Sequence, residues 1–320
     1  MNETLDDLDR AVRLTIATVP TVEVHDEPDP AAIPSAGSDT WWKVPDVVVV
    51  SFDLRNSTQL GTSRRRDTST ARIYRAAIDG AVQRLHGFDA GFIDIQGDGG
   101  FGLFWGERKV ERAMCAAITI ATFSRRLVER LNRKWDDLPA TGFKVGVARG
   151  RTLVKNLGTP RKPAEQEPVW AGKPVNYATK CAQTAESQQI VVAGSVWDAI
   201  ADNDLLVYTC NCAGGRSYFW EDHLIDKLPD GDEEQFGRRT RLAKPLEWCP
   251  ECGTATCNEI LAGVTRRDIS DYMRASVEAR AMQGQAARIA RTRRSQQRTL
   301  RMLDALLEGY TDDLPPTARS

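Results

Sequence analysis

The sequence lacks the features that would assign it to a membrane, a secreted or a strongly basic class of protein. It has no apolar run near the roughly twenty residues that span a bilayer, and its acidic start, "MNETLDDLDR", has no signal-peptide core. Its formal net charge is −1, so composition gives no overall attraction to nucleic acid or membranes. We therefore expect a cytoplasmic protein whose seven cysteines are thiols or metal ligands rather than disulfides.

Changes in composition divide the 320 residues into four segments. Residues 1–40 combine a short amphipathic stretch with "HDEPDPAAIPSAGSDT", which is typical of a linker or a mobile arm. Residues 41–200 carry regular apolar patterns and form the main predicted domain. Residues 201–265 are a cysteine-containing extension, and residues 266–320 are a basic helix with a short acidic, proline-containing tail.

The main domain alternates strand and helix patterns. The β-branched run "DVVVVSFDL" predicts a buried strand, and "FIDIQGDGGFGLFWG" predicts a hairpin with a glycine-rich turn. The other expected elements are helices over about 56–85, 107–135 and from Pro174, a strand pair within 143–158, and a strand at 190–194. This order predicts an α+β fold, an antiparallel sheet with helices on one face and a ferredoxin-like core.

Two carboxylates end neighbouring strands of this predicted sheet. Asp53 ends the first strand and Asp98 lies at the hairpin tip, so both would project from the same end of the sheet. Adjacent carboxylates repel each other unless a cation lies between them, and Mg²⁺ held by carboxylates and substrate phosphates is common in phosphoryl-transfer sites. Asn56, Ser57 and Thr58 then begin a helix, whose N-terminus favours a phosphate. The pattern predicts a metal–triphosphate site; the alternative is a helix cap and a turn residue.

Three motifs in this order resemble the catalytic domain of class III nucleotide cyclases: "FDLRNST", "QGDGGFGLF" and "GKPVNYATK". The resemblance itself covers about residues 45–194. We therefore expect the whole predicted domain, residues 41–200, to be the cyclase domain. It implies that Asp53, Asp98 and the Leu54 carbonyl hold two Mg²⁺ or Mn²⁺ ions, while the ribose 3′-oxygen attacks the α-phosphorus and expels pyrophosphate. Asn176 and Lys180 would steady the ribose and the α-phosphate. Lys180 replaces the family's arginine, which keeps the charge but loses the bidentate contact. Without the family, Asn176 is a helix cap and Lys180 lies on a solvated face.

The positions at which the family's purine cyclases read the base differ here. They hold Asp94 and Val169, and a carboxylate cannot donate to purine N1 while valine forms no hydrogen bond. Phe52 replaces a small residue before the metal-binding aspartate, and its bulk would narrow the base pocket towards a pyrimidine. We expect UTP because Asp94 can accept from an imide N–H, although it could also accept from the amino group of cytosine. A cytidylate or a purine cyclase is the alternative.

These departures, with the N-terminal arm and the cysteine-containing extension, resemble the bacterial pyrimidine cyclases of Pycsar anti-phage defence. That resemblance implies a cyclic UMP or cyclic CMP product that activates a separate effector protein. The class III resemblance implies a homodimer whose sites take the metal-binding residues from one subunit and Asn176 and Lys180 from the other. A degenerate, nucleotide-binding sensor is the alternative from another class, and retention of both aspartates and Asn176 speaks against it.

The extension contains a possible structural zinc site. Cys249-Pro-Glu-Cys252 is a C-x₂-C knuckle, and Cys210 and Cys212 could supply the other two thiolates of a tetrahedral Zn²⁺. Cys257 and His223 are rival ligands, and reduced, half-buried thiols are the alternative.

The arginine-rich C-terminal helix would suit a zinc-ribbon nucleic-acid binder. Its interleaved apolar residues instead favour a packing helix with a solvated basic side. These apolar residues are Val277, Met282, Ile289, Leu300, Leu303 and Leu306. We therefore expect neither a nucleic-acid partner nor a membrane partner.

Overall fold

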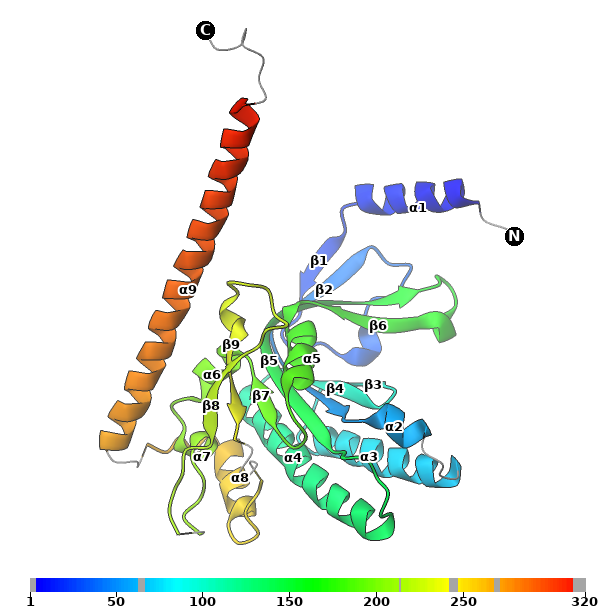
Figure 1. Ribbon diagram of the computed structural model, residues 1–320. Helices are drawn as coiled ribbons and strands as arrows, with labels where there is room; N and C mark the ends of the chain where they lie inside the picture. Colours follow the sequence, from blue (N-terminus) through cyan, green and yellow to red (C-terminus); the bar gives the residue numbers. More distant parts are fainter. Residues whose placement is uncertain (1–3, 63–66, 213, 242–246, 268–270, 313–320) are drawn as a thin grey trace.

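The protein is described here by a computed structural model that covers residues 4–62, 67–212, 214–241, 247–267 and 271–312, without the side chains of 61–62, 271–281 and 303–312. The predicted acidic tail lies outside the described residues. Within these ranges, one sheet runs through the molecule and helices lie against both of its faces (Figure 1). None of the described helices combines the length and the apolar character that crossing a membrane requires.

The strands are β1 (Thr21–Val24), β2 (Thr40–Leu54), β3 (Phe92–Gln96), β4 (Gly99–Phe104), β5 (Phe143–Gly158), β6 (Gln166–Ala171), β7 (Ile190–Val192), β8 (Trp220–Leu224) and β9 (Phe236–Thr240). The α-helices are α1 (Leu5–Ala17), α2 (Ser57–Thr62), α3 (Asp67–Gly87), α4 (Lys109–Lys134), α5 (Lys173–Thr184), α6 (Gly194–Ile200), α7 (Asp204–Val207), α8 (Gly253–Leu261) and α9 (Asp271–Asp312). Short 3₁₀ turns lie at Pro30–Ala32, Pro163–Glu165 and Glu233–Gln235.

The order of the strands confirms the predicted α+β, ferredoxin-like core. The described sheet runs β3-β4-β2-β5-β7-β9-β8, with β1 beside β2 and β6 beside β5. Strands β3, β4, β2 and β5 pair antiparallel with one another in that order, and α3 and α4 connect them as in a split βαβ unit. Strand β2 lies at the centre because both faces of its β-branched run are buried.

Helices cover both faces of the sheet rather than the one face that the sequence predicted. Val48 and Val50 of β2 pack in one hydrophobic cluster with α3 and α4, whereas Val47 and Val49 pack in a second cluster with α5. Helix α5 approaches β5 closely at Gly146, where an added Cβ would lie 2.0 Å from a main-chain oxygen of α5. A glycine at this point therefore allows the second layer to form.

Strand β5 corrects another expectation, because residues 143–158 form one long strand and not a strand pair. At Gly150 the backbone stays extended, with φ 158°, so the chain continues without a turn. Strand β5 pairs with β2 from Phe143 to Val154 and with β7 near its start, and its far end pairs with β6. The strand therefore connects the core of the sheet to the β5–β6 arm.

The N-terminal segment has more structure than a linker. Strand β1 pairs in parallel with β2, in the register Thr21↔Thr40, and Ile33 is 6% exposed against the sheet. Helix α1 has no buried residue, and it projects from the body in Figure 1. The prediction of a mobile arm over residues 1–40 therefore does not describe residues 21–39, which dock on the sheet.

The cysteine-containing extension is continuous with the cyclase-like core. Strands β8 and β9 extend the same sheet beyond β7, and α8 packs against α4 through the fully buried Ile260. Trp248, which precedes α8, donates from Nε1 to Thr119 Oγ1 of α4 at 2.7 Å. The described residues of this extension, 201–212, 214–241 and 247–265, thus add strands to the main sheet and a helix against α4.

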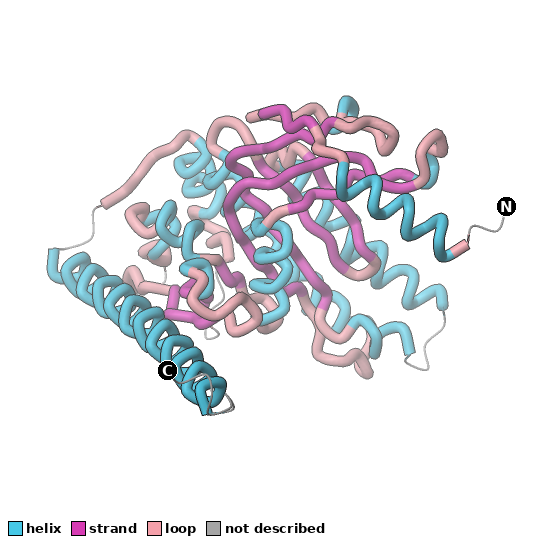
Figure 2. Tube along the Cα trace, turned by 90° about the horizontal axis from the view of Figure 1, so that it is seen from above, coloured by secondary structure: helices cyan, strands magenta, loops and turns pink. Residues whose placement is uncertain are grey.

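Helix α9 is long and stands along one side of the body (Figures 1 and 2). It touches the sheet where Arg288 donates to the main-chain oxygen of Phe236 at 2.8 Å. Met282, Ile289 and Leu300 are 68%, 50% and 60% exposed, so this chain alone does not cover the apolar residues that were expected to pack. The side chains of Val277, Leu303 and Leu306 lie outside the described residues.

Candidate active site

The structure brings Asp53 and Asp98 to one end of the sheet. Asp53 lies opposite Gly99 in the β2–β4 register, and the Leu54 N–H donates to the main-chain oxygen of Asp98 at 3.2 Å. Both side chains are partly exposed. A carboxylate at the end of a buried strand and one at a hairpin tip therefore face solvent side by side.

The glycines of the hairpin allow this close approach. Gly97 adopts φ 65°, a left-handed conformation that glycine reaches without strain. At Gly99, an added Cβ would lie 2.6 Å from the main-chain oxygen of Phe52. The turn can therefore pack directly on the end of β2, which sets the position of Asp98.

Lys144 is a site residue that the sequence reasoning missed. It lies opposite Asp53 in the β2–β5 register, and its Nζ forms an ion pair with Asp53 Oδ2. The lysine side chain is 18% exposed and the aspartate side chain is 36% exposed. The sequence signal was a single lysine in the otherwise apolar start of β5. That signal points to Asp53 only when the β2–β5 register is known, and these two strands are distant in sequence.

The donors at this end of the sheet fit a hard divalent cation. Two carboxylates and the adjoining Leu54 carbonyl are oxygen ligands of the kind that Mg²⁺ and Mn²⁺ prefer. Solvent reaches both carboxylates, which leaves room for phosphate oxygens and water as further ligands. The neighbouring ammonium group of Lys144 suits a polyanionic substrate.

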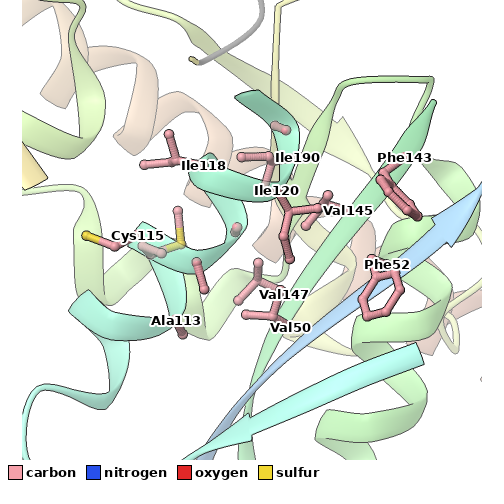
Figure 3. Close-up of a cluster of buried hydrophobic side chains, with 14 of the residues drawn as sticks. Val50, Phe52, Ala113, Cys115, Ile118, Ile120, Phe143, Val145, Val147 and Ile190 are labelled. Atoms are coloured by element: carbon pink, nitrogen blue, oxygen red, sulfur yellow. The ribbon is translucent and has the colours of Figure 1, made fainter. Parts of the chain in front are cut away.

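Phe52 does not lie in this site, which corrects the prediction that it narrows the base pocket. Its side chain is 1% exposed and packs edge-on against Phe143, with ring centroids 5.5 Å apart. Figure 3 shows it among the residues of the core on the α3 and α4 side of the sheet. Successive strand residues alternate between faces, so a position next to Asp53 points away from the face that carries Asp53.

The residues after Leu54 take different roles. Asn56 adopts a left-handed backbone conformation, φ 57°, and its side-chain amide donates to the Ala140 main-chain oxygen at 2.7 Å, so it braces a neighbouring loop. Ser57 begins α2 and is partly buried, while Thr58 is exposed. The hydroxyl groups of Ser57 and Thr58 therefore lie a few residues after Asp53, at the start of the short helix α2.

Asp94 lies on the same face of the sheet as Asp53. It pairs with Phe101 across β3 and β4, and Phe101 in turn pairs with Ser51, two residues before Asp53. Its Oδ2 accepts from Gln96 Nε2 at 2.8 Å. Val169 of β6 is 39% exposed.

Aromatic rings connect the neighbourhoods of Asp94 and Val169. The ring of Trp170, which follows Val169 on β6, lies 5.2 Å from the ring of Phe92 between centroids. Phe92 lies on β3, on the same face as Asp94. The two predicted base-reading positions therefore belong to elements that touch, although Val169 and Trp170 alternate between the two faces of β6.

Asn176 and Lys180 lie one turn apart on α5. The helix buries Pro174, Tyr177, Ala178, Cys181 and Ala182, leaving Asn176 exposed and Lys180 partly exposed. Lys180 Nζ lies 6.0 Å from the centroid of the Tyr177 ring. Across the part of the chain that the structure describes, no hydrogen bond or ion pair joins either residue to Asp53 or Asp98.

The carboxylate with a strongly lowered pKa lies elsewhere. Asp46, near the middle of β2 at the irregularity between Val44 and Val47, accepts from Arg149 Nε and Nη2 at 2.8 and 2.7 Å and pairs with Lys109 Nζ at 2.8 Å. These contacts, above all the hydrogen bonds from Arg149, lower its pKa to about 2. Asp46 connects β2 to β5 through Arg149 and to the start of α4 through Lys109. Because these two cations already balance its charge, we assign it a structural role.

Four of the cysteines converge as the sequence suggested. The sulfur atoms of Cys210, Cys212, Cys249 and Cys252 all lie within 4.8 Å of one another. Neither rival, Cys257 or His223, belongs to this group. Cys257 lies instead on α8, where it packs against the core.

The ferredoxin-like core, the two carboxylates at adjacent strand ends, and an Asn and a Lys one turn apart on α5 fit the nucleotide cyclase pattern that the sequence resemblance implies. Curated relatives agree. A uridylate cyclase from Propioniciclava tarda is 48% identical over 283 residues, 87% of this chain and 90% of the relative. A uridylate cyclase from Micromonospora echinofusca is 45% identical over 265 residues, 82% of this chain and 85% of the relative. The chain belongs to this uridylate cyclase family, and it is a nucleotide cyclase.

Solved structures give weaker matches. The adenylyl cyclase CyaB from P. aeruginosa aligns at a TM-score of 0.47 and 14% identity, covering 64% of this chain and 97% of that one. The guanylyl cyclase Cya2 aligns at a TM-score of 0.48 and 14% identity, with 64% and 97% coverage. No protein-family model matches the chain.

Proposed function

We propose that this chain converts UTP to 3′,5′-cyclic UMP and pyrophosphate, with Mg²⁺ or Mn²⁺ as cofactor. The observation that carries the proposal is the 48% identity to a uridylate cyclase over 87% of the chain. The paired carboxylates at the ends of β2 and the β3–β4 hairpin support it, because they are the residues that such a reaction needs.

Residues of this chain would position the triphosphate and its ribose. Asp53, Asp98 and the Leu54 carbonyl would hold the divalent cations, which when bound lower the pKa of the ribose 3′-hydroxyl and neutralise phosphate charge. Lys144, beside Asp53, would donate to the triphosphate. The 3′-hydroxyl would give its proton to water, its oxygen would form a bond to the α-phosphorus, the bond from that phosphorus to the bridging oxygen would break, and pyrophosphate would leave with the electron pair.

Asn176 and Lys180 would act on the other side of the reacting phosphorus. The Asn176 amide can both donate to and accept from the ribose, which orients the 3′-oxygen. The Lys180 ammonium group would offset the charge that develops on the α-phosphate oxygens. Both side chains are accessible on α5, as contact with a substrate requires.

Asp94 would select the base. Uracil presents an N3–H flanked by two carbonyl oxygens, so a carboxylate can accept from N3 while a neighbouring amide donates to a carbonyl. Gln96, already hydrogen-bonded to Asp94, has a second amide hydrogen for that purpose. Cytosine can offer the same pair an amino N–H for Asp94 and the neighbouring N3 acceptor for Gln96. The preference for UTP over CTP therefore rests on the identity to uridylate cyclases.

The active enzyme would be a homodimer with sites at the interface. No hydrogen bond or ion pair joins Asn176 or Lys180 to the two aspartates within the described residues, which is consistent with a site shared between chains. Co-expression of Asp53→Asn and Asn176→Ala chains tests this. Random pairing makes half of the dimers mixed, each with one intact site, so activity should return to about one quarter of wild type. Co-expression of Asp53→Asn with Asp98→Asn should restore nothing, because both changes damage the same half of every site. No recovery in the first pair would contradict shared sites.

The reaction itself is tested by incubating the purified protein with each of the four ribonucleoside triphosphates and Mn²⁺, and by identifying the products by mass. We expect cyclic UMP as the main product, and its loss in Asp53→Asn and Asp98→Asn. Asp202→Asn, a change of an exposed carboxylate paired with Arg267, is the matched control and should retain activity. If none of the nucleotides gives a cyclic product, the enzymatic proposal is wrong and the alternative of a degenerate, nucleotide-binding sensor remains. Cyclic CMP or cyclic AMP as the main product would contradict UTP specificity.

The proposed biological role is second-messenger synthesis in Pycsar-type anti-phage defence, in which cyclic UMP activates a separate effector protein. The resemblance to pyrimidine cyclases of that system supports it. The test is to measure cyclic UMP in bacteria that express the wild-type chain or Asp53→Asn, before and during phage infection. A rise in the wild type alone is expected, and an unchanged level during infection would contradict this role while leaving the enzymatic proposal intact.

A further inference from the structure

The four-cysteine cluster joins two segments that are distant in sequence. Cys210 and Cys212 follow α7, before β8, whereas Cys249 and Cys252 immediately precede α8. Their sulfur atoms lie within 4.8 Å of one another. In a tetrahedral zinc site with Zn–S bonds of about 2.3 Å, neighbouring sulfur atoms lie about 3.8 Å apart. Small side-chain adjustments would therefore give all four sulfurs a common centre.

The local backbone at the second pair has the shape of a metal knuckle. The Gly253 N–H donates to the Cys249 main-chain oxygen at 2.7 Å, which closes a turn between the two cysteines and starts α8. An added Cβ at Gly253 would lie 2.7 Å from the Trp248 Cβ, so glycine suits this tight turn. The fold therefore brings Cys249 and Cys252 together independently of the other pair.

The surroundings of the cluster favour a metal over simple thiol packing. Three of the four side chains are only half-buried and Cys212 is exposed, so they contribute little apolar burial. Two disulfides would need only two separate contacts, whereas here every sulfur lies near each of the other three. Four thiolates match the preference of Zn²⁺ and leave no open coordination position, which is typical of a structural site.

We propose that Cys210, Cys212, Cys249 and Cys252 bind one structural Zn²⁺ per chain, which ties the loop before β8 to the start of α8. Helix α8 and Trp248 are in turn fastened to α4, a helix of the cyclase core, through Ile260 and the hydrogen bond to Thr119. The metal thereby fixes the extension against the cyclase core. This zinc site does not depend on the proposed reaction, since none of its four cysteines belongs to the candidate active site around Asp53 and Asp98.

The test measures metal in the full-length protein purified under reducing conditions. We expect about one zinc ion per chain by elemental mass spectrometry, and less than about a tenth of that in Cys212→Ser and Cys249→Ser. Cys257→Ser, which removes a thiol of α8 outside the cluster, should keep the full zinc content. Wild-type protein without zinc after refolding with ZnCl₂, or equal zinc in wild type and both variants, would overturn the proposal.

A second measurement covers variants that fail to fold. Wild-type protein stripped of metal and titrated with CoCl₂ should develop the strong thiolate charge-transfer and visible bands of a tetrahedral cobalt–thiolate site, saturating at one equivalent and reversed by Zn²⁺. Metal removal should also speed amide exchange about tenfold or more in α8 but not in β2. Absent cobalt bands, or intramolecular disulfides among the four cysteines in freshly purified protein, would refute the zinc site.

Discussion

Replacing Lys144 by methionine removes the cation next to Asp53 while keeping most of the side-chain volume. Strands β2 and β5 hold the two residues opposite each other, and the lysine is only 18% exposed, so its position is fixed before substrate binds. A hydrogen bond to a charged group contributes about 1.5–3 kcal/mol. With roughly 1.4 kcal/mol for each factor of ten, kcat/KM for UTP should fall about 10–150-fold in Lys144→Met.

The assay follows cyclic UMP formation against UTP concentration at saturating Mn²⁺. Lys144→Arg keeps the charge and should lose less than the methionine variant, because a guanidinium group can still reach phosphate oxygens. Lys162→Met is the control, since Lys162 is 63% exposed and pairs with Glu165 on a loop. The Mn²⁺ requirement should not rise in Lys144→Met, because Asp53 loses a competing cation. A kcat/KM within twofold of wild type in a folded Lys144→Met protein would show that Lys144 only balances Asp53.

Further predictions concern the base, the sheet and the α5 layer. Asp94→Ala should lower kcat/KM for UTP by about 10–100-fold in nucleotide competition assays; an equal loss for every nucleotide would contradict a role in base choice. Arg149 lowers the pKa of Asp46 to about 2, so this carboxylate stabilises the fold above about pH 4, an effect lost as pH falls towards 2. Asp46→Asn should therefore lower the free energy of unfolding by about 1 kcal/mol at pH 7, after discounting for solvent screening, by about half of that near pH 3 and by much less near pH 2, in urea titrations. Gly146→Val, with its Cβ 2.0 Å from an α5 oxygen, should cost about 3 kcal/mol or more in thermal unfolding, whereas Gly37→Ala, in open space, should not.

The sequence predicts the elements of the core well because their signals are local. The β-branched run of β2, the glycine-rich hairpin and the apolar faces of α3 and α4 each occupy one continuous stretch. The errors arise where a long-range contact decides the outcome. Gly150 is suited to a turn, yet pairing with strands on either side of it keeps β5 extended, and residues 21–39 have a linker's composition but gain a strand by pairing with β2.

The candidate site divides in the same way, by whether a residue's role depends on its neighbours in sequence or on its neighbours across the sheet. Asp53 and Asp98 can be found from sequence because strand end and hairpin tip are local features whose adjacency follows from the topology. The role of Lys144 cannot be found from sequence, because the lysine lies opposite Asp53 in only one of several possible β2–β5 registers. A register shift of one residue would turn its side chain to the other face of the sheet. The same alternation explains the error at Phe52: a residue next to Asp53 along the strand has its side chain on the opposite face, in the core. Residues two apart, such as Asp94 and Gln96, are therefore the better place to look for base selection.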